Sequence, residues 1–379
     1  MKKILAVVII MLFCFMPLAG CANNMDKGKQ YWIRNISFSP DGKKLLFNCN
    51  KSYQKPMIHT YDLDTGELIA YKSPIGEEWD YPQYSFDGKY IVFVTFPLKI
   101  IHPKGLFRSE DETIIVPGKS QIAVMDEAGK NVRKITNTCG YKTDPSFSHS
   151  GMKIIFARSD IHRKRSQMGW NWSVNEVDVE TGRETCLTQF KFFSMSRPYY
   201  FPDDKTFIFW AEYLTVSPGI SDDDQSMESF RKVENIRKEL ESKYQRNSIY
   251  VMHANENEIK PYIVTPDYQK KFKGYVKECQ YSRSPALSAD GSVLIFRAQG
   301  YKPDGSADFD HLYQYSTDGN HRSITRIPST ETEEAVSHDG KQVAFIPRYS
   351  NKIVIYQVKD GTSREITLPD KPSRIINSQ

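Results

Sequence analysis

The sequence predicts an all-β protein: a six-bladed β-propeller of four-stranded antiparallel blades, with one helical insertion. A ten-residue pattern recurs six times within residues 36–368. The composition, with 22 Tyr, 21 Phe, 20 Pro and 21 Gly, favours strands separated by turns. Repeated sheet modules that cannot each bury both faces close most economically as a ring.

The repeat is an apolar residue, a tight turn and an apolar run that ends in Phe. In the first copy, Pro40 presets the backbone for the turn, Asp41 can bond nearby amides and Gly42 accepts a positive φ. The fourth copy has Asp204 in place of the glycine, and aspartate also tolerates the left-handed region. Each copy is followed by a second strand pair, which makes four strands per unit. The copies are residues 38–47, 84–93, 147–156, 200–209, 287–296 and 336–345.

This repeat resembles the WD-repeat-like units of the TolB-like β-propeller family. The resemblance covers residues 36–368, which we assign to the propeller, and leaves 369–379 as a C-terminal tail. It is specific for the fold. It says little about function, because one propeller scaffold hosts many unrelated activities.

The first twenty residues have the features of an export signal. Two lysines precede an apolar stretch at residues 4–16, which is too short to span a bilayer, and small residues precede Cys21. The four residues that end at Cys21 resemble the lipobox of bacterial lipoproteins. That resemblance implies a signal peptide at residues 1–20, acylation of Cys21, a lipid-anchored linker at residues 21–35 and, because Ala22 follows, sorting to the outer membrane of the cell envelope.

Net charge and cysteine spacing exclude several classes of function. The formal net charge of +5 becomes +3 when Lys2 and Lys3 leave with the signal, which is too small to indicate a nucleic-acid partner. The other cysteines lack the close spacing of a metal or redox pair. A disulfide between some of them and free buried thiols both remain open, and we favour free thiols. These cysteines are Cys49, Cys139, Cys186 and Cys279.

The two rims of the predicted ring differ in loop length. The turns within each strand pair are short and share one face, the turn rim. The long connections share the opposite face, the loop rim, and the first of them contains two strand-like segments that predict a hairpin, at 98–102 and 113–116. Function concentrates on long connections of a rigid scaffold, so we expect it on the loop rim. The long connections are 94–120, 157–172, 210–247, 266–283 and 297–310.

The longest connection is predicted to contain a helix from about Ser221 to Tyr244. Acidic residues stand at its start, and apolar residues recur at helical spacing. The apolar stripe either docks a partner or covers the channel of the ring, or it packs on the propeller's own rim, which is the commoner role of such stripes. The stripe residues considered for partner binding are Met227, Phe230, Ile236 and Leu240.

A basic cluster precedes two tryptophans in the third unit. Arg163, Lys164 and Arg165 are followed by Trp170 and Trp172. This combination could bind a phosphate, a lipid headgroup or a sugar. The alternative, which we favour, is a solvated loop whose tryptophans pack into a seam between blades.

The sequence contains none of the searched signatures of catalysis or metal binding. It has no Gly-x-Ser-x-Gly elbow, no His-Glu-x-x-His, no Cys-x-x-Cys and no phosphate-binding Gly-x-x-x-x-Gly-Lys. His149 and His338 occupy the slot that holds Pro40 in the first turn, so we assign them structural roles. Residues 62–66 resemble the start of a calcium loop but lack its later ligands, which favours a simple turn. We predict no catalytic residue, metal or cofactor.

These observations favour a non-catalytic cell-envelope lipoprotein. It would act as a propeller scaffold that binds an envelope protein or peptide on the loop rim. Acylated Cys21 would anchor it to the membrane, and we expect no nucleic-acid partner. The alternative is a polysaccharide-active enzyme of the oligogalacturonate-lyase-like propeller type, although no residue pattern marks such a site. A third possibility is a structural subunit of a larger envelope assembly.

Overall fold

The computed structural model describes residues 31–51, 56–101, 112–160, 170–216, 235, 247–254, 256, 259–262, 283–301, 307–318, 321–327, 331–347 and 352–378. Most residues in these ranges lie in β-strands, and the rest form turns, connections and a short 3₁₀ helix, η1 (Pro117–Lys119). No helix within them is long and apolar enough to cross a membrane. The helix expected from Ser221 to Tyr244 falls outside these ranges except for Asn235, so the helical insertion stays a prediction.

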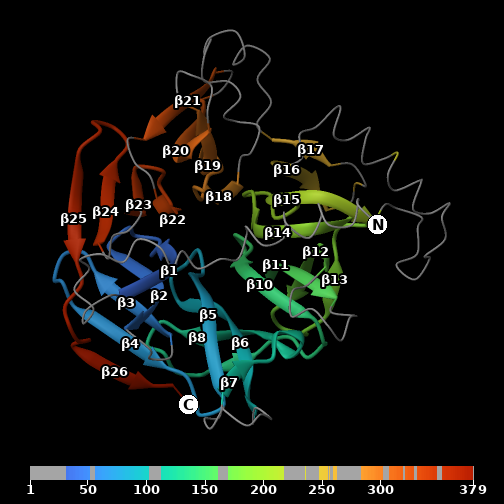
Figure 1. Ribbon diagram of the computed structural model, residues 1–379, viewed down its shortest axis with the longest axis vertical. Coiled ribbons are helices and arrows are strands. Elements are labelled where there is room, and N and C mark those ends of the chain that lie inside the picture. Colours follow the sequence, from blue (N-terminus) through green and yellow to red (C-terminus); the bar gives the residue numbers. More distant parts are fainter. Residues whose placement is uncertain are drawn as a thin grey trace, which may run out of the picture.

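The strands form four-stranded antiparallel units around a common centre, and the first strand of each unit lies nearest that centre (Figure 1). Unit 1 contains β1 (Tyr31–Phe38), β2 (Lys44–Lys51), β3 (Met57–Asp62) and β4 (Leu68–Lys72). Unit 2 contains β5 (Glu77–Tyr84), β6 (Tyr90–Ile101), β8 (Gln121–Asp126) and β9 (Arg133–Lys134). Unit 3 contains β10 (Tyr141–Phe147), β11 (Lys153–Asp160), β12 (Trp170–Asp178) and β13 (Glu184–Cys186).

The remaining strands repeat this order. Unit 4 contains β14 (Lys191–Tyr200), β15 (Thr206–Val216), β16 (Asn247–His253) and β17 (Lys260–Pro261). Unit 5 contains β18 (Arg283–Leu287), β19 (Val293–Tyr301), β20 (Ala307–Asp318) and β21 (His321–Ile327). Unit 6 contains β22 (Glu331–Val336), β23 (Gln342–Pro347), β24 (Lys352–Gln357) and β25 (Ser363–Thr367).

Hydrogen bonding groups these strands into five sheets, not into the six separate sheets expected from the repeat. Units 3 and 4 form one eight-stranded sheet. Their junction is a single residue pair, Trp172 on β12 with Phe192 on β14. On each side of this junction, units 3 and 4 contain four antiparallel strands, as the other units do.

Two further strands extend the units. β7 (Glu112–Ile115) pairs antiparallel with the end of β6, which confirms the hairpin predicted from residues 98–102 and 113–116. β26 (Arg374–Asn377) pairs in parallel with β4 and adds a fifth strand to unit 1. Strand structure therefore reaches beyond the expected propeller bounds of 36–368, because β1 begins at Tyr31 and the tail contributes β26.

The repeated turn is closed by its own side chains. In the first copy, Ser39 Oγ donates to Asp41 Oδ1 at 2.6 Å and accepts from the backbone N–H of Lys44 at 2.9 Å. Gly42 has a φ of 70°, and Asp204 takes the same conformation with a φ of 52°. Hydrogen bonds that close within one turn make the hairpin a local property of the sequence.

The hydrophobic core lies between the units. The described residues contain six buried apolar clusters, and each joins side chains from two neighbouring units. One cluster packs Ile33 and Leu45 of unit 1 against Ala344 and Ile353 of unit 6, which closes the ring. Each unit therefore depends on its neighbours to remove its faces from water.

Candidate functional site

Five of the inner strands bulge at an equivalent position. In β1, β5, β10, β14 and β18 the pairing register shifts, and within each shift lies a non-glycine residue with a positive φ. Bulges redirect side chains, and repeated backbone strain of this kind motivates a search for function at the same place. The five residues are Asn35 (φ 53°), Tyr81 (φ 56°), Asp144 (φ 51°), Arg197 (φ 51°) and Ser284 (φ 53°).

Arg197, from the bulge of β14, bridges two carboxylates on β22. Its Nη2 lies 2.9 Å from Glu333 Oε2, and its Nη1 lies 2.5 Å from Glu334 Oε1. Arg297 Nε on β19 lies 2.9 Å from the other oxygen of Glu334, although the pair is not aligned as a hydrogen bond. The Glu334 side chain is fully buried and that of Arg197 is 11% exposed. Charges so far from water depend on one another for stabilisation.

A second group of polar contacts holds Asp80 on β5. Its carboxylate accepts a hydrogen bond from Asn35 Nδ2 at 2.7 Å and lies 3.3 Å from Arg34 Nη2. The backbone N–H of Asn35 also donates to Glu333 Oε2 at 3.3 Å, which links this group to the first. We call the charged residues together the channel cluster. They are Arg34, Asp80, Asp144, Arg197, Arg297, Glu333 and Glu334, four carboxylates and three guanidinium groups.

Burial shifts the acid–base properties of the channel cluster. It raises the pKa of Asp144 from 3.8 to about 6, although the Arg197 guanidinium opposes the rise, and the carboxylates of Glu333 and Asp80 add to it. Burial also raises the pKa of Glu334, against the effects of Arg297 and Arg197. Asp144 therefore exchanges a proton closer to neutral pH than an ordinary aspartate does.

Aromatic rings from the turns plug the channel at the turn rim. The ring of Phe86 stacks on His149 with centroids 3.8 Å apart and lies 5.1 Å from the ring of His338. His149 Nε2 lies 2.6 Å from the carbonyl oxygen of Ala289, whose N–H donates to the carbonyl of His338 at 2.9 Å. These contacts join units 2, 3, 5 and 6. Burial lowers the pKa of His338 to about 4, so this ring is neutral at physiological pH.

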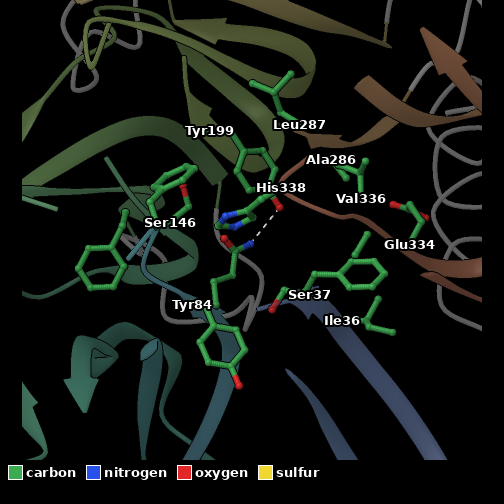
Figure 2. Close-up of a pocket in the computed structure, with 15 residues that line it drawn as sticks. Ile36, Ser37, Tyr84, Ser146, Tyr199, Ala286, Leu287, Glu334, Val336 and His338 are labelled. Carbon is green, nitrogen blue, oxygen red and sulfur yellow. Dashed lines mark hydrogen bonds between the residues drawn. The ribbon is translucent and has the colours of Figure 1, made fainter. Parts of the chain in front are cut away.

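A small cavity lies between this plug and the channel cluster. It measures about 60 Å³ and is lined both by Glu334 of the cluster and by Phe86 and His338 of the plug (Figure 2). A hydrogen bond of 2.9 Å from Gln83 Nε2 to the hydroxyl of Tyr199 crosses it. The cavity has room for a few water molecules and for nothing larger.

Large apolar side chains stand exposed at the loop rim. Trp32, near the start of β1, is 58% exposed, and Phe193, near the start of β14, is 36% exposed. Both are on inner strands, and β1 and β14 belong to units on opposite sides of the ring (Figure 1). Ile75, in the connection from β4 to β5, is fully exposed. Aromatic residues are enriched where proteins bind partners, so this mouth is a candidate contact surface.

The described residues contain no group of three or more His, Cys, Asp or Glu side chains that could hold a metal ion. His59 is buried on β3, and its Nδ1 lies 2.9 Å from the carbonyl oxygen of Met57. Burial lowers its pKa to about 4, which agrees with a structural role. Asp62 accepts hydrogen bonds from two backbone N–H groups of its own turn, as expected for a turn rather than a calcium loop.

The cysteines described are Cys49, Cys139 and Cys186, and all three are free. Cys49 is buried, as we expected, and burial raises its pKa to about 12. Cys139 and Cys186 are exposed, so the expectation of burial is wrong for these two. Cys139 lies in the connection from β9 to β10, and Cys186 ends β13, the outermost strand of unit 3, so both lie near the surface. Cys279 lies outside the described residues.

The structure describes few of the sequence-predicted site residues. Trp172 is 8% exposed, and its ring lies 5.3 Å from that of Tyr141 in the seam between units 3 and 4. Trp172 therefore packs in the seam, as the favoured alternative expected, and its part in partner binding stays a prediction. Trp170 begins β12, and its side chain is outside the description. The other predicted residues, Cys21, Arg163, Lys164, Arg165, Met227, Phe230, Ile236 and Leu240, lie outside the described ranges.

Sequence reasoning missed the channel cluster. A signal was present: in four copies of the repeat a polar residue followed by proline stands three residues before the conserved apolar position of the turn. Those pairs are Tyr81-Pro82, Asp144-Pro145, Arg197-Pro198 and Ser284-Pro285. Charged residues at the inner edge of a repeated module would converge on the axis of a ring.

No family model matches the sequence, and no curated protein matches it. Similar solved structures do exist. TolB from Acinetobacter baumannii is 17% identical with a TM-score of 0.53, over 91% of this chain and 65% of that one. The chain has a TolB-like β-propeller fold. It spans less than two thirds of that TolB chain.

Other propellers are similar to the same degree. An oligogalacturonate lyase in complex with manganese is 15% identical with a TM-score of 0.52, over 88% of this chain and 77% of that one. An oligogalacturonate lyase from Vibrio parahaemolyticus is 13% identical with a TM-score of 0.52, over 91% of this chain and 80% of that one. At such identities the TolB-like fold is shared, and function has to be argued from the site.

Proposed function

We propose that the protein is a non-catalytic lipoprotein of the cell envelope, a six-bladed TolB-like propeller that binds a protein or peptide at the loop-rim mouth of its channel. The six-blade count is supported by the six apolar clusters between described units, one of which joins units 1 and 6. The single residue pair between β12 and β14 is then a contact between two blades.

The observation that carries the proposal is the asymmetry of the channel. The turn rim is filled by Phe86, His149 and His338, whereas the loop-rim side presents the channel cluster with Trp32 and Phe193 at its entrance. Rigid walls, charged groups and exposed aromatic side chains suit the recognition of another protein. The cluster has one more carboxylate than guanidinium, which favours a partner with an amino or guanidinium group at this point.

The proposed lipid anchor agrees with this orientation. β1 starts at Tyr31 on the loop rim, so nine residues, 22–30, separate it from Cys21. The ten Cα-to-Cα steps from Cys21 to Tyr31 reach about 35 Å when extended. An acylated Cys21 would therefore keep the mouth close to the membrane, where a membrane-associated partner would meet it.

Site-specific crosslinking in intact cells tests the proposal. A photo-reactive residue at Trp32 or Phe193 is expected to capture a discrete partner. Matched positions on the turn rim are Tyr90 (48% exposed) and Met152 (66% exposed), and these are expected to capture none or different proteins. Equal capture from both rims, or none from Trp32 and Phe193, would contradict the assignment of the binding face.

A further inference from the structure

A second cavity lies on the turn rim, away from the channel mouth. It measures about 530 Å³ and occupies the seam between units 1 and 2. Its inner wall includes Thr60, Tyr71 and Tyr84, and Ile69 of β4 and Ile376 of β26 form its apolar side. We call it the seam cavity. A volume of this size is within the range of pockets that hold small molecules.

The hydroxyl of Tyr84 is the feature that points to a ligand. Tyr84 is 6% exposed, and among the described residues its hydroxyl has no hydrogen-bond partner. Figure 2 shows this hydroxyl turned away from the side chains that line the channel. Burying a hydroxyl without a partner costs stability, so a retained one suggests that something else bonds to it.

A residue at the same repeat position provides the comparison. Tyr200 is the equivalent of Tyr84 in unit 4, is similarly buried, and donates a hydrogen bond to Glu176 Oε2 at 2.5 Å. The position therefore accommodates a satisfied tyrosine elsewhere in this ring. At Tyr84, by contrast, no carboxylate of the described residues takes the place of Glu176, and the seam cavity lies beside the ring.

The charges around the seam cavity limit the class of ligand. Lys44 Nζ lies 2.5 Å from Glu127 Oε1, and Arg374 Nη2 lies 3.8 Å from Glu67 Oε1. The charged lining residues number three of each sign: Lys44, Lys130 and Arg374 with Asp62, Glu67 and Glu127. A lining without net charge favours neither cations nor anions as a class, but it presents many donors and acceptors beside two isoleucine side chains.

We propose that the seam cavity binds a neutral polyhydroxylated molecule of the size of a mono- or disaccharide. Hydroxyl groups both donate and accept, so they can bond to Tyr84 and to the paired charges without breaking the balance. The C–H faces of such a molecule pack against Ile69 and Ile376. This site is separate from the channel mouth, and it stands whether or not the mouth binds a protein.

Calorimetric titration of the purified full chain with glucose, N-acetylglucosamine, maltose and trehalose tests the proposal, with glucosamine and galacturonate as charged comparators. Saturable binding of at least one neutral sugar is expected, with weaker binding of the charged ones. Tyr84→Phe removes one hydrogen bond and should weaken that binding about three- to tenfold. Ile69→Trp fills the seam cavity and should abolish it.

Tyr200→Phe is the matched control. It should leave sugar binding unchanged and lower the unfolding temperature, because Glu176 loses the hydrogen bond from Tyr200 and keeps those from Lys153. Tyr84→Phe should keep or raise the unfolding temperature of the sugar-free protein, since it removes an unpaired hydroxyl. Absence of binding by every neutral sugar, preference for a charged comparator, or unchanged affinity in both Tyr84→Phe and Ile69→Trp would overturn the proposal.

Discussion

Replacing Asp144 by asparagine should stabilise the protein, and the effect should depend on pH. Asp144 is part of the channel cluster, and burial raises its pKa from 3.8 to about 6. The folded state therefore binds the proton more tightly than the unfolded state. Its contribution to stability is fully present below pH 3.8 and is lost as pH rises towards 6. Asparagine resembles the protonated acid in shape and also tolerates the positive φ of this position.

The magnitude follows from the shift in pKa. A rise of about two units corresponds to about 3 kcal/mol between the two protonation states. Asp144→Asn should therefore raise the free energy of unfolding by less than about 1 kcal/mol at pH 4 and by about 3 kcal/mol at pH 8. The gain at pH 8 equals the free energy of unfolding that the wild-type protein loses by keeping an ionised carboxylate in the channel cluster.

Urea unfolding followed by tryptophan fluorescence, at intervals from pH 4 to pH 8, measures this difference. Asp41→Asn is the control of opposite sign. Burial is the largest single effect on Asp41 and opposes its ionisation. Hydrogen bonds from Ser39 and Lys43, together with the charges of Lys43 and Lys44, outweigh it and lower the pKa. That variant should be destabilised at neutral pH, and its deficit should shrink as pH falls through the lowered pKa. A difference between Asp144→Asn and wild type that does not change with pH would refute the reasoning.

Three other substitutions probe the same architecture. Arg197→Met removes the bridge between Glu333 and Glu334 and should lower the free energy of unfolding in urea by about 3–5 kcal/mol. Replacing the fully buried Glu334 by glutamine in the same variant should restore part of this loss. Gly129→Ala would place its Cβ 2.3 Å from a ring carbon of Tyr71 at a φ of 77°, so we expect a loss of about 1–3 kcal/mol in thermal unfolding. Phe86→Ala rehydrates His338, and NMR titration should show the pKa of that ring rising from about 4 towards 6.5; an unchanged pKa would argue against the plug.

The repeated hairpins could be predicted from the sequence because their chemistry is local. Ser39, Asp41 and Gly42 bond and bend within a few residues, so each turn carries its own signal. The hairpin of β6 and β7 could also be predicted, because its two strands are close together in the sequence. These local units, repeated along the chain, were sufficient to indicate the fold.

The channel cluster could not be predicted in the same way. The contact between Arg197 and Glu333 joins residues 136 positions apart, and it exists only once the inner strands meet on the axis. Trp172 shows the same limit. It ends a long connection beside basic residues in the sequence, but it is part of β12, where it pairs with Ser159 of β11 and packs its ring on Tyr141 of the same unit. Burial of a tryptophan is decided by its neighbours in space, which the local pattern does not contain.

The parallel pairing of β26 with β4 has a consequence for biosynthesis. Unit 1 is translated early, yet the strand that covers its outer edge emerges only after every other described strand. During synthesis that edge of β4 is an unpaired strand, which can recruit the strands of other chains. A holdase chaperone that masks β4 until residues 374–377 arrive would protect the nascent protein from aggregation at this one edge.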